Sequence, residues 1–187
     1  MGKLTVFNHV SLDGYFTDAK GDMSWAYEGV DEEFSAFTSE NARSGGGGIM
    51  LFGKVTYDLM AAYWPTPAAE KAMPDVARKM NSSPKVVFSR SMDRAVWSNT
   101  KFVKGDVASE VWKMKNESDM IIFGSGTIVS PLAEAGLIDE YDFIVNPVIL
   151  GKGRTLFEGM SKKLKLKLTK SRVFKNGKAH LCYEPAV

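Results

Sequence analysis

Short runs rich in Val, Ile, Leu and Phe recur along the chain, and Gly, Pro, Asn or Asp bounds most of them. This pattern predicts β-strands. The expected strands are Leu4–Val10, Ile49–Phe52, Lys85–Ser89, Met120–Phe123, Tyr141–Ile149, Leu164–Val173 and Lys178–Tyr183. Lysine and leucine alternate in Leu164–Val173, which predicts a strand with one wet face and one buried face.

Apolar residues about one helical turn apart predict helices between these strands. The expected helices are Asp31–Ala42, Val55–Ala62, Ala68–Met80, Val107–Lys115 and Ile128–Ala135. Asp106 is a plausible N-cap for the fourth helix, and Gly136 a plausible end for the fifth.

Strands and helices alternate as far as about residue 138, which favours a largely parallel sheet with helices on both faces. Three strands without a helix follow, and Asn176-Gly177 predicts a two-residue hairpin turn between the last two. The predicted fold is therefore α/β, with a mostly parallel central sheet and an antiparallel C-terminal hairpin. The run Gly45 to Gly48 reads as a flexible joint too short to separate domains, so one domain is expected over residues 1–187.

Charge and composition narrow the function. The 24 basic and 22 acidic residues nearly cancel, so nothing favours nucleic acid or a membrane surface as partner. We expect neither a signal peptide nor a membrane span, and hence a cytoplasmic protein. The single cysteine, Cys182, excludes an intrachain disulfide and is expected to be buried. His9 and His180 each stand alone on a strand pattern, so no metal site is expected.

Three strand ends carry glycines, hydroxyls and a cation, the groups that bind phosphate at the carboxyl edge of a parallel sheet. They are Gly53, Lys54 and Thr56; Ser89 and Arg90; and Gly124, Ser125, Gly126 and Thr127. None forms a complete dinucleotide-binding or P-loop fingerprint, which argues against an ordinary Rossmann or P-loop protein.

Several segments resemble a known family. Gly53-Lys54-Val55-Thr56-Tyr57 resembles the Gly-Arg-x-Thr-(Trp/Tyr) motif of dihydrofolate reductases. A more specific resemblance is to the reductase domain of the bifunctional riboflavin-biosynthesis deaminase/reductase and its stand-alone relatives. The segments that carry it are Ser11–Tyr15, Gly21–Trp25, Val87–Arg90 and Pro147–Phe157. The deaminase motifs are absent from this chain.

The resemblance implies a dihydrofolate-reductase-like fold and NADPH as cofactor. Lys54 and Thr56 would then meet phosphates, Ser89 and Arg90 would hold the ribose 2′-phosphate, and Gly124 to Thr127 would take the pyrophosphate. A cation beside hydroxyls is also what a 2′-phosphate requires physically. Lys54 stands where the dihydrofolate-reductase motif more often has arginine. Its ammonium group is a point charge, whereas a guanidinium group can donate two parallel hydrogen bonds.

On the substrate side, the resemblance implies a catalytic role for Asp13. Glu33 is a second candidate, expected beside an apolar pocket that raises its pKa. Trp25 is placed to close over the nicotinamide or to pack in the core, and Arg154 to bind a substrate phosphate.

The chain is thus expected to be an NADPH-dependent reductase of a small heterocyclic or ribosylamino substrate. The nearest family activity is reduction of 5-amino-6-(5-phosphoribosylamino)uracil. Dihydrofolate reduction and a catalytically silent NADP-binding protein are the alternatives. A homodimer is expected from the resemblance and from the long C-terminal strands.

Overall fold

A computed structural model describes residues 1–44 and 48–186. Gly45 to Gly47, and with them most of the predicted joint, lie outside the described residues. The strands are β1 (Leu4–Ser11), β2 (Thr17–Asp18), β3 (Ile49–Gly53), β4 (Lys85–Phe88), β5 (Thr100–Val103), β6 (Met120–Phe123), β7 (Glu140–Asn146), β8 (Gly153–Arg154), β9 (Leu166–Val173) and β10 (Ala179–Pro185). The helices are α1 (Glu32–Ser44), α2 (Lys54–Tyr63), α3 (Pro67–Ala72), α4 (Pro74–Ser82), α5 (Val107–Met114) and α6 (Gly126–Glu134), with a 3₁₀ turn at Ser24–Tyr27.

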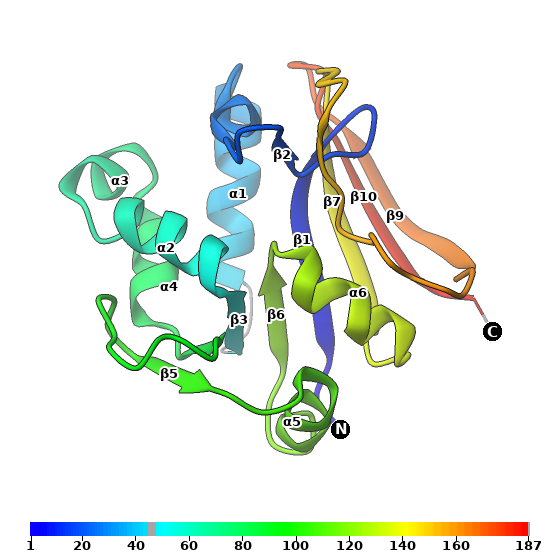
Figure 1. Ribbon diagram of the computed structural model, residues 1–187. Coiled ribbons are helices and arrows are strands. Elements are labelled where there is room, and N and C mark those ends of the chain that lie inside the picture. The colour runs from blue at the N-terminus through cyan, green and yellow to red at the C-terminus, as the bar shows by residue number, and fades with distance from the viewer. Residues whose placement is uncertain (45–47, 187) are drawn as a thin grey trace.

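One 8-stranded sheet has the order β5-β4-β3-β6-β1-β7-β10-β9. The strands from β5 to β7 are parallel, whereas β10 runs antiparallel to both of its neighbours. The prediction of a mostly parallel sheet with an antiparallel C-terminal end is confirmed. Because β5, β4, β3, β6, β1 and β7 run the same way, their carboxyl ends meet at one edge of the sheet. Figure 1 shows β6 and β1 side by side in the middle of the sheet.

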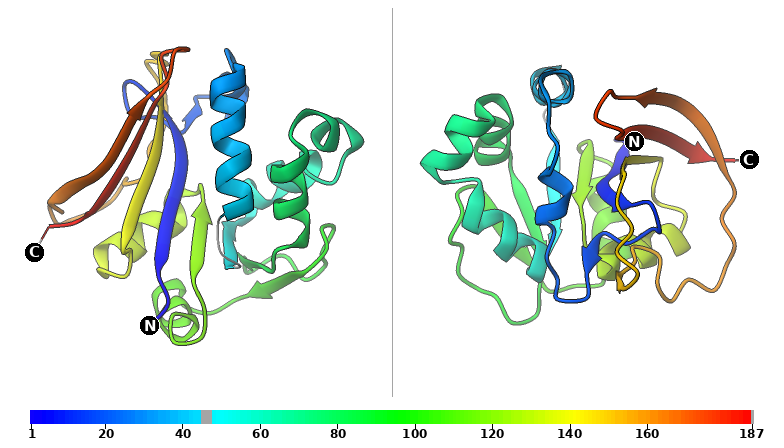
Figure 2. Two further views of the ribbon diagram at one scale, coloured as in Figure 1. Left: turned by 180° about the vertical axis from the view of Figure 1, so that it is seen from behind. Right: turned by 90° about the horizontal axis from the view of Figure 1, so that it is seen from above.

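Helices cover both faces of this sheet. Figure 2 shows α1 and α4 on one face, with α5 and α6 on the other. Side chains alternate between these layers along β1: Leu4 and Val6 join the core beneath α5 and α6, while Phe7 packs toward α1. None of the helices in the described part of the chain is long and apolar enough to cross a membrane.

The structure corrects one predicted helix and adds one strand that was not predicted. The helix expected over Ala68–Met80 is two helices that meet at Met73, because Pro74 disfavours a helical conformation in the residue before it and opens α4. Strand β5 was not predicted, since its four residues, Thr-Lys-Phe-Val, are too few to show a pattern.

The C-terminal hairpin also differs from expectation. Its loop has three residues, because the amide of Phe174 donates to the carbonyl of Lys178 and the amide of Gly177 to the carbonyl of Phe174. Gly177 takes the left-handed conformation with φ of 85°. This is the three-residue loop that ends in a glycine, not a two-residue turn. The preceding strand, β9, is exposed at every position, so the prediction that one of its faces is buried is wrong for the isolated chain.

Candidate functional site

Two of the three predicted phosphate sites touch each other. β3 and β6 are neighbours, so the turn after Gly53 lies against the turn at Gly124–Thr127. A Cβ atom on Gly53 would lie 2.5 Å from Ser125 Oγ, and one on Gly124 would lie 3.2 Å from Thr56 Oγ1. Glycine is therefore required at both positions for the turns to approach this closely.

The helices that begin at these turns have no capping side chain. Gly53 is the N-cap residue of α2 and Ser125 that of α6, and in neither helix does a side chain accept from the first-turn amides. α1, α3 and α5, by contrast, are capped by Asp31, Thr66 and Asp106, whereas α4 has no side-chain cap. Free amides and the positive ends of two helix dipoles thus converge at one point, an arrangement that binds anionic groups.

Ser125 adopts φ of 73°, an uncommon conformation for a residue with a side chain. Its hydroxyl lies 2.5 Å from that of Thr127, and the amide of the preceding Gly124 donates to Asn8 Oδ1 at 3.1 Å. Asn8 of β1 thus holds the turn in place. The hydroxyl-bearing residues of the turn stay accessible, since Ser125 is partly exposed and Thr127 is exposed.

The other predicted cofactor residues surround these turns. Lys54 is exposed in the first turn of α2 and pairs with Asp58 at 2.7 Å. Ser89 follows β4, and its hydroxyl accepts from the amides of Ser91 and Met92. Arg90 is exposed at the same strand end. The sheet order places β4 next to β3, so the three predicted phosphate sites lie at adjacent strand ends.

A cavity of about 570 Å³ lies between the sheet and α1 and reaches the Gly124 turn. Its size is within the range of small-molecule pockets. Aromatic and aliphatic side chains form most of its wall near the turn: Phe7, Tyr27, Val30, Phe34, Met60, Trp64 and Phe123. Tyr27 and Phe34 lie beside the imidazole of His9, with ring centroids 5.8 and 6.2 Å from it.

His9 belongs to a buried polar chain. Lys178 Nζ donates to Asn146 Oδ1 at 2.5 Å, and Asn146 Nδ2 donates to the carbonyls of Val10 and Ile144 and lies 3.4 Å from His9 Nδ1. Burial and the Lys178 charge lower the pKa of His9 to about 4, so the ring is neutral at neutral pH.

Asp13 lies at the rim and does not line the cavity. Its carboxylate accepts from the Ser11 hydroxyl at 2.7 Å, from the Leu150 amide at 3.1 Å and from the Gly151 amide at 2.7 Å. These donors lower the pKa of Asp13, the Ser11 hydroxyl most of all. The side chain clasps the loop after β1 to the loop after β7.

Glu33 does not behave as expected. Its carboxylate accepts from the Lys175 amide and from Arg172, both at 3.1 Å, and it does not line the cavity. These contacts lower its pKa, whereas a raised pKa was expected, so that expectation is wrong. The neighbouring Phe34 and Phe37, not Glu33, face the cavity.

The two remaining substrate-side candidates also lie outside the cavity wall. Trp25 is 8% exposed and donates from its indole to the Asp22 carbonyl at 3.1 Å, which agrees with its packing role. Arg154 is exposed in β8, which pairs with β2 at the carboxyl edge of the sheet.

His180 is not isolated, contrary to expectation. It shares one face of β10 with Cys182, and the two lie against Asp142 of the neighbouring β7. Cys182 is buried, as predicted.

Several cavity residues escaped the sequence analysis. His9 and Tyr27 line the cavity, and Asn146 and Lys178 support His9 from behind. The sequence held one clue: His9 shares a strand face with Phe7, opposite the apolar Leu4 and Val6. The partners of His9 come from β7 and the hairpin, and their approach depends on strand order.

The chain has recognisable relatives. It is 26% identical over 176 residues to YyaP, an uncharacterized protein of Bacillus subtilis (strain 168), and the match covers 93% of this chain and 90% of the relative. A Thermotoga maritima diaminohydroxyphosphoribosylaminopyrimidine deaminase/5-amino-6-(5-phosphoribosylamino)uracil reductase superposes with a TM-score of 0.66 at 15% identity. That match covers 99% of this chain and 57% of that chain.

The dihydrofolate reductase of Enterococcus faecalis, solved with NADP(H) and RAB-propyl, superposes with a TM-score of 0.62 at 12% identity, covering 100% of this chain and 98% of that chain. At such identities the superpositions show a shared fold, which confirms the expected dihydrofolate-reductase-like architecture. Residues 2–179 match the family described as the RibD C-terminal domain. The chain belongs to the RibD C-terminal domain family, and its fold is dihydrofolate-reductase-like.

Proposed function

We propose that this protein is an NADPH-dependent reductase that acts on a small heterocyclic or ribosylamino compound. The observation that carries the proposal is the meeting of two uncapped helix N-termini, α2 and α6, beside an apolar cavity. The Thermotoga maritima relative is named as a reductase of a ribosylamino-uracil, and the Enterococcus faecalis structure contains NADP(H). Both support the reaction class.

The residues at the carboxyl edge fit such a cofactor. Gly53 and Gly124 let the two turns approach closely, and the free amides of α6 suit a pyrophosphate. Lys54 and Thr56 would meet phosphate oxygens from α2, and Arg90 with Ser89 would hold the ribose 2′-phosphate. NADPH, when bound, supplies the hydride, while the cavity orients the substrate and excludes water.

His9 is the polar group best placed to orient a substrate. Its Nδ1 lies 3.4 Å from Asn146 Nδ2, and the neutral ring can exchange a hydrogen bond with a substrate carbonyl or ring nitrogen. Asp13 and Glu33 both have lowered pKa values, which disfavours either as a proton donor near neutral pH. We therefore assign Asp13 a positioning role through the loop that it clasps, and water the role of proton source.

The cofactor assignment is tested by Arg90→Ala. If Arg90 binds the 2′-phosphate, this change should weaken NADPH about 10- to 100-fold, the loss of one charge-assisted hydrogen bond, and leave NADH unchanged. Titration calorimetry measures both constants. Arg94→Ala, an exposed arginine in the same loop, is the control and should alter neither. Equal affinity of the unchanged protein for NADPH and NADH would refute the assignment.

Turnover separates a reductase from a silent binding protein. Ribosylamino-pyrimidines and dihydropterins would be screened by the loss of NADPH absorbance. Reduction of a ribosylamino-pyrimidine supports the proposal, and reduction of dihydrofolate would move the protein to the alternative activity. Tight NADPH binding without turnover across the panel would establish the non-catalytic alternative.

A further inference from the structure

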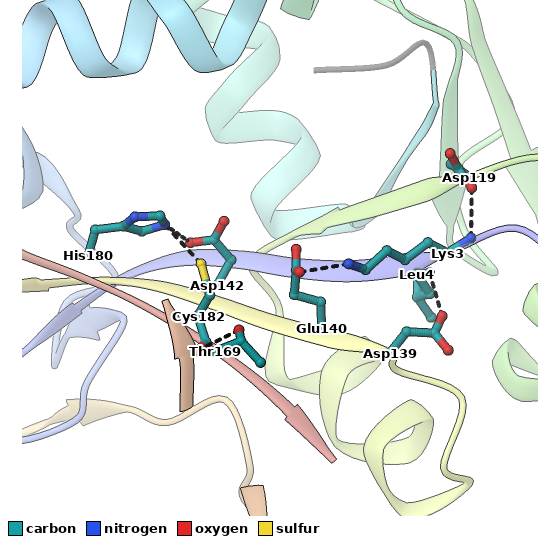
Figure 3. Close-up of polar contacts among 9 residues, drawn as sticks. All are labelled: Lys3, Leu4, Asp119, Asp139, Glu140, Asp142, Thr169, His180 and Cys182. Atoms are coloured by element: carbon teal, nitrogen blue, oxygen red, sulfur yellow. Dashed lines mark hydrogen bonds and ion pairs between the residues drawn. The ribbon is translucent and has the colours of Figure 1, made fainter. Parts of the chain in front are cut away.

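A second group of chemically active side chains lies on the same face of the sheet, away from the predicted phosphate sites. Asp142 on β7 and Cys182 on β10 are paired directly across the antiparallel ladder. His180, two residues before Cys182, projects from the same face. Figure 3 shows the three side chains turned toward one another, with the Lys3–Glu140 ion pair farther along the sheet. All of these residues line the cavity.

The three donor atoms converge on one point. His180 Nε2 lies 2.5 Å from Asp142 Oδ1 and 3.3 Å from Cys182 Sγ, and all three atoms are within 4.8 Å of one another. A nucleophile–histidine–carboxylate relay uses opposite nitrogens of the ring. Here one nitrogen faces both partners, so the arrangement cannot pass a proton from thiol to carboxylate through the imidazole.

The thiol is also a poor nucleophile. Cys182 is 3% exposed, and its burial and the nearby carboxylates raise its pKa to about 12. Only the thiolate is reactive, and it is scarcely populated at such a pKa. A different role has to account for a nitrogen, a sulfur and an oxygen donor directed at one position.

We propose that Asp142, His180 and Cys182 form a binding site for a zinc-type divalent transition metal, with a fourth coordination position open to the cavity. An imidazole, a thiolate and a carboxylate are the ligands that zinc prefers, whereas Mg²⁺ and Ca²⁺ take oxygen ligands. This site is independent of the proposed reductase function.

The geometry needs little adjustment. Zinc bonds of about 2.0 to 2.3 Å at tetrahedral angles set the ligand atoms roughly 3.3 to 3.6 Å apart. The sulfur–nitrogen distance is already 3.3 Å, and the nitrogen–oxygen distance of 2.5 Å must open by about 1 Å. Metal binding therefore requires Asp142, whose side chain is 18% exposed, to rotate away from the imidazole.

The charges balance when the metal binds. Cys182 releases its thiol proton to solvent, and the S–metal bond replaces the S–H bond. Thiolate and carboxylate then carry two negative charges against the two positive charges of the ion. Glu140 is held by Lys3 at 2.7 Å, so water or a cavity ligand takes the fourth position. Lys170, opposite Cys182 on β9, is exposed and can turn away into solvent.

Cobalt(II) tests the site directly. Chelator-treated, tag-free protein would be titrated with Co²⁺, which gives a near-ultraviolet charge-transfer band when bound by thiolate and strong visible bands when four-coordinate. Because the chain has a single cysteine, any thiolate band reports Cys182 without a variant. Both bands are expected at one equivalent, and Zn²⁺ should abolish them by displacement while Mg²⁺ does not.

Variants assign the ligands. Cys182→Ser should remove the charge-transfer band, and His180→Gln should weaken Co²⁺ binding by more than about tenfold, since even outer-shell changes cost 10- to 100-fold. His9→Gln, a histidine in the same cavity, is the matched control and should bind Co²⁺ unchanged. Circular dichroism checks that each variant is folded. Absence of a thiolate band in the unchanged protein at excess Co²⁺ would overturn the proposal.

Discussion

At the scale of single residues, hydrogen-bond partners decide what each polar group near the cavity can do. Asn146 is fixed by Lys178 on one side and by two carbonyls on the other, and it lies against Nδ1 of His9. Asp13 and Glu33 accept from backbone amides, which favours their ionised forms. The residue types alone show none of these constraints.

The pKa of His9 predicts a pH dependence of stability. Its pKa is about 4 in the folded chain against 6.5 for an ordinary histidine, so the unfolded chain binds the proton first as pH falls. The free energy of unfolding should therefore decline between pH about 6.5 and about 4, and this contribution should level off below that range.

His9→Phe removes the titrating group, so its unfolding free energy should decline less over the same interval. Urea unfolding at several pH values measures both proteins. Carboxylates with lowered pKa values act from about pH 5 downward, so the two proteins are compared between about pH 6.5 and pH 5. Parallel curves for the two proteins would contradict the assignment.

The clasp at Asp13 predicts a local effect of Asp13→Asn. An asparagine retains one acceptor oxygen but presents an NH₂ group to the second amide, so the loop after β7 should open more often. Amide exchange at Leu150 and Gly151 should accelerate by roughly fivefold, the loss of one hydrogen bond. Asp18→Asn is the control, because Asp18 holds the amides of Lys20 and Asp22 in another loop. Unchanged exchange at Leu150 and Gly151 would show that the clasp is not needed.

At the scale of elements, the helices that begin at the candidate cofactor site lack a capping side chain, as α4 also does. α3 and α5 lie away from the cavity turn and are capped by their own side chains, while α2 and α6 leave their first amides free at the candidate cofactor site. A helix start without a cap is less stable, and an anion bound at the free amides offsets that loss.

Gly124→Ala tests this element. Its φ of 66° costs an alanine about 1 to 2 kcal/mol, and the added Cβ would lie 3.2 Å from Thr56 in the first turn of α2. NADPH affinity should fall by about tenfold or more. Gly159→Ala has similar backbone strain, with φ of 82°, but nothing within 4 Å of its Cβ, so it should lose stability and keep its NADPH affinity. Equal NADPH affinity in the two variants would count against the turn as a phosphate site.

At the scale of the whole molecule, the sheet ends in an unprotected edge. β9 is the outermost strand beside β10, and each of its eight positions is exposed. Leu166 and Leu168 are 36% and 48% exposed. Apolar side chains on an unpaired edge favour association with another chain.

We therefore propose that the protein is a homodimer joined through β9. Light scattering at micromolar concentration should give twice the chain mass, and Leu168→Lys should give a monomer. Trp112→Lys, which changes a 55% exposed side chain on α5, should remain dimeric. A monomer in the unchanged protein would mean that the lysines of β9 serve as edge protection.

The segments that led to the cofactor prediction lie at adjacent strand ends of the sheet. Gly53 and Gly124 were singled out from the sequence, and both stand where two turns meet. Glu33 misled because its position beside Phe34 and Phe37 showed the apolar wall but not Arg172, which comes from a strand 139 residues later.

The sequence by itself determined the alternation of strands and helices, the faces of β1 and the glycine turns, because these depend on side-chain period and on backbone conformation within a few residues. The tertiary structure alone decided which strands are neighbours. It brought Asp142 beside His180 and Cys182, Lys178 behind His9, and the α2 turn against the α6 turn. Strand order and register are set by long-range packing of the sheet, and a local pattern carries no record of its distant partner.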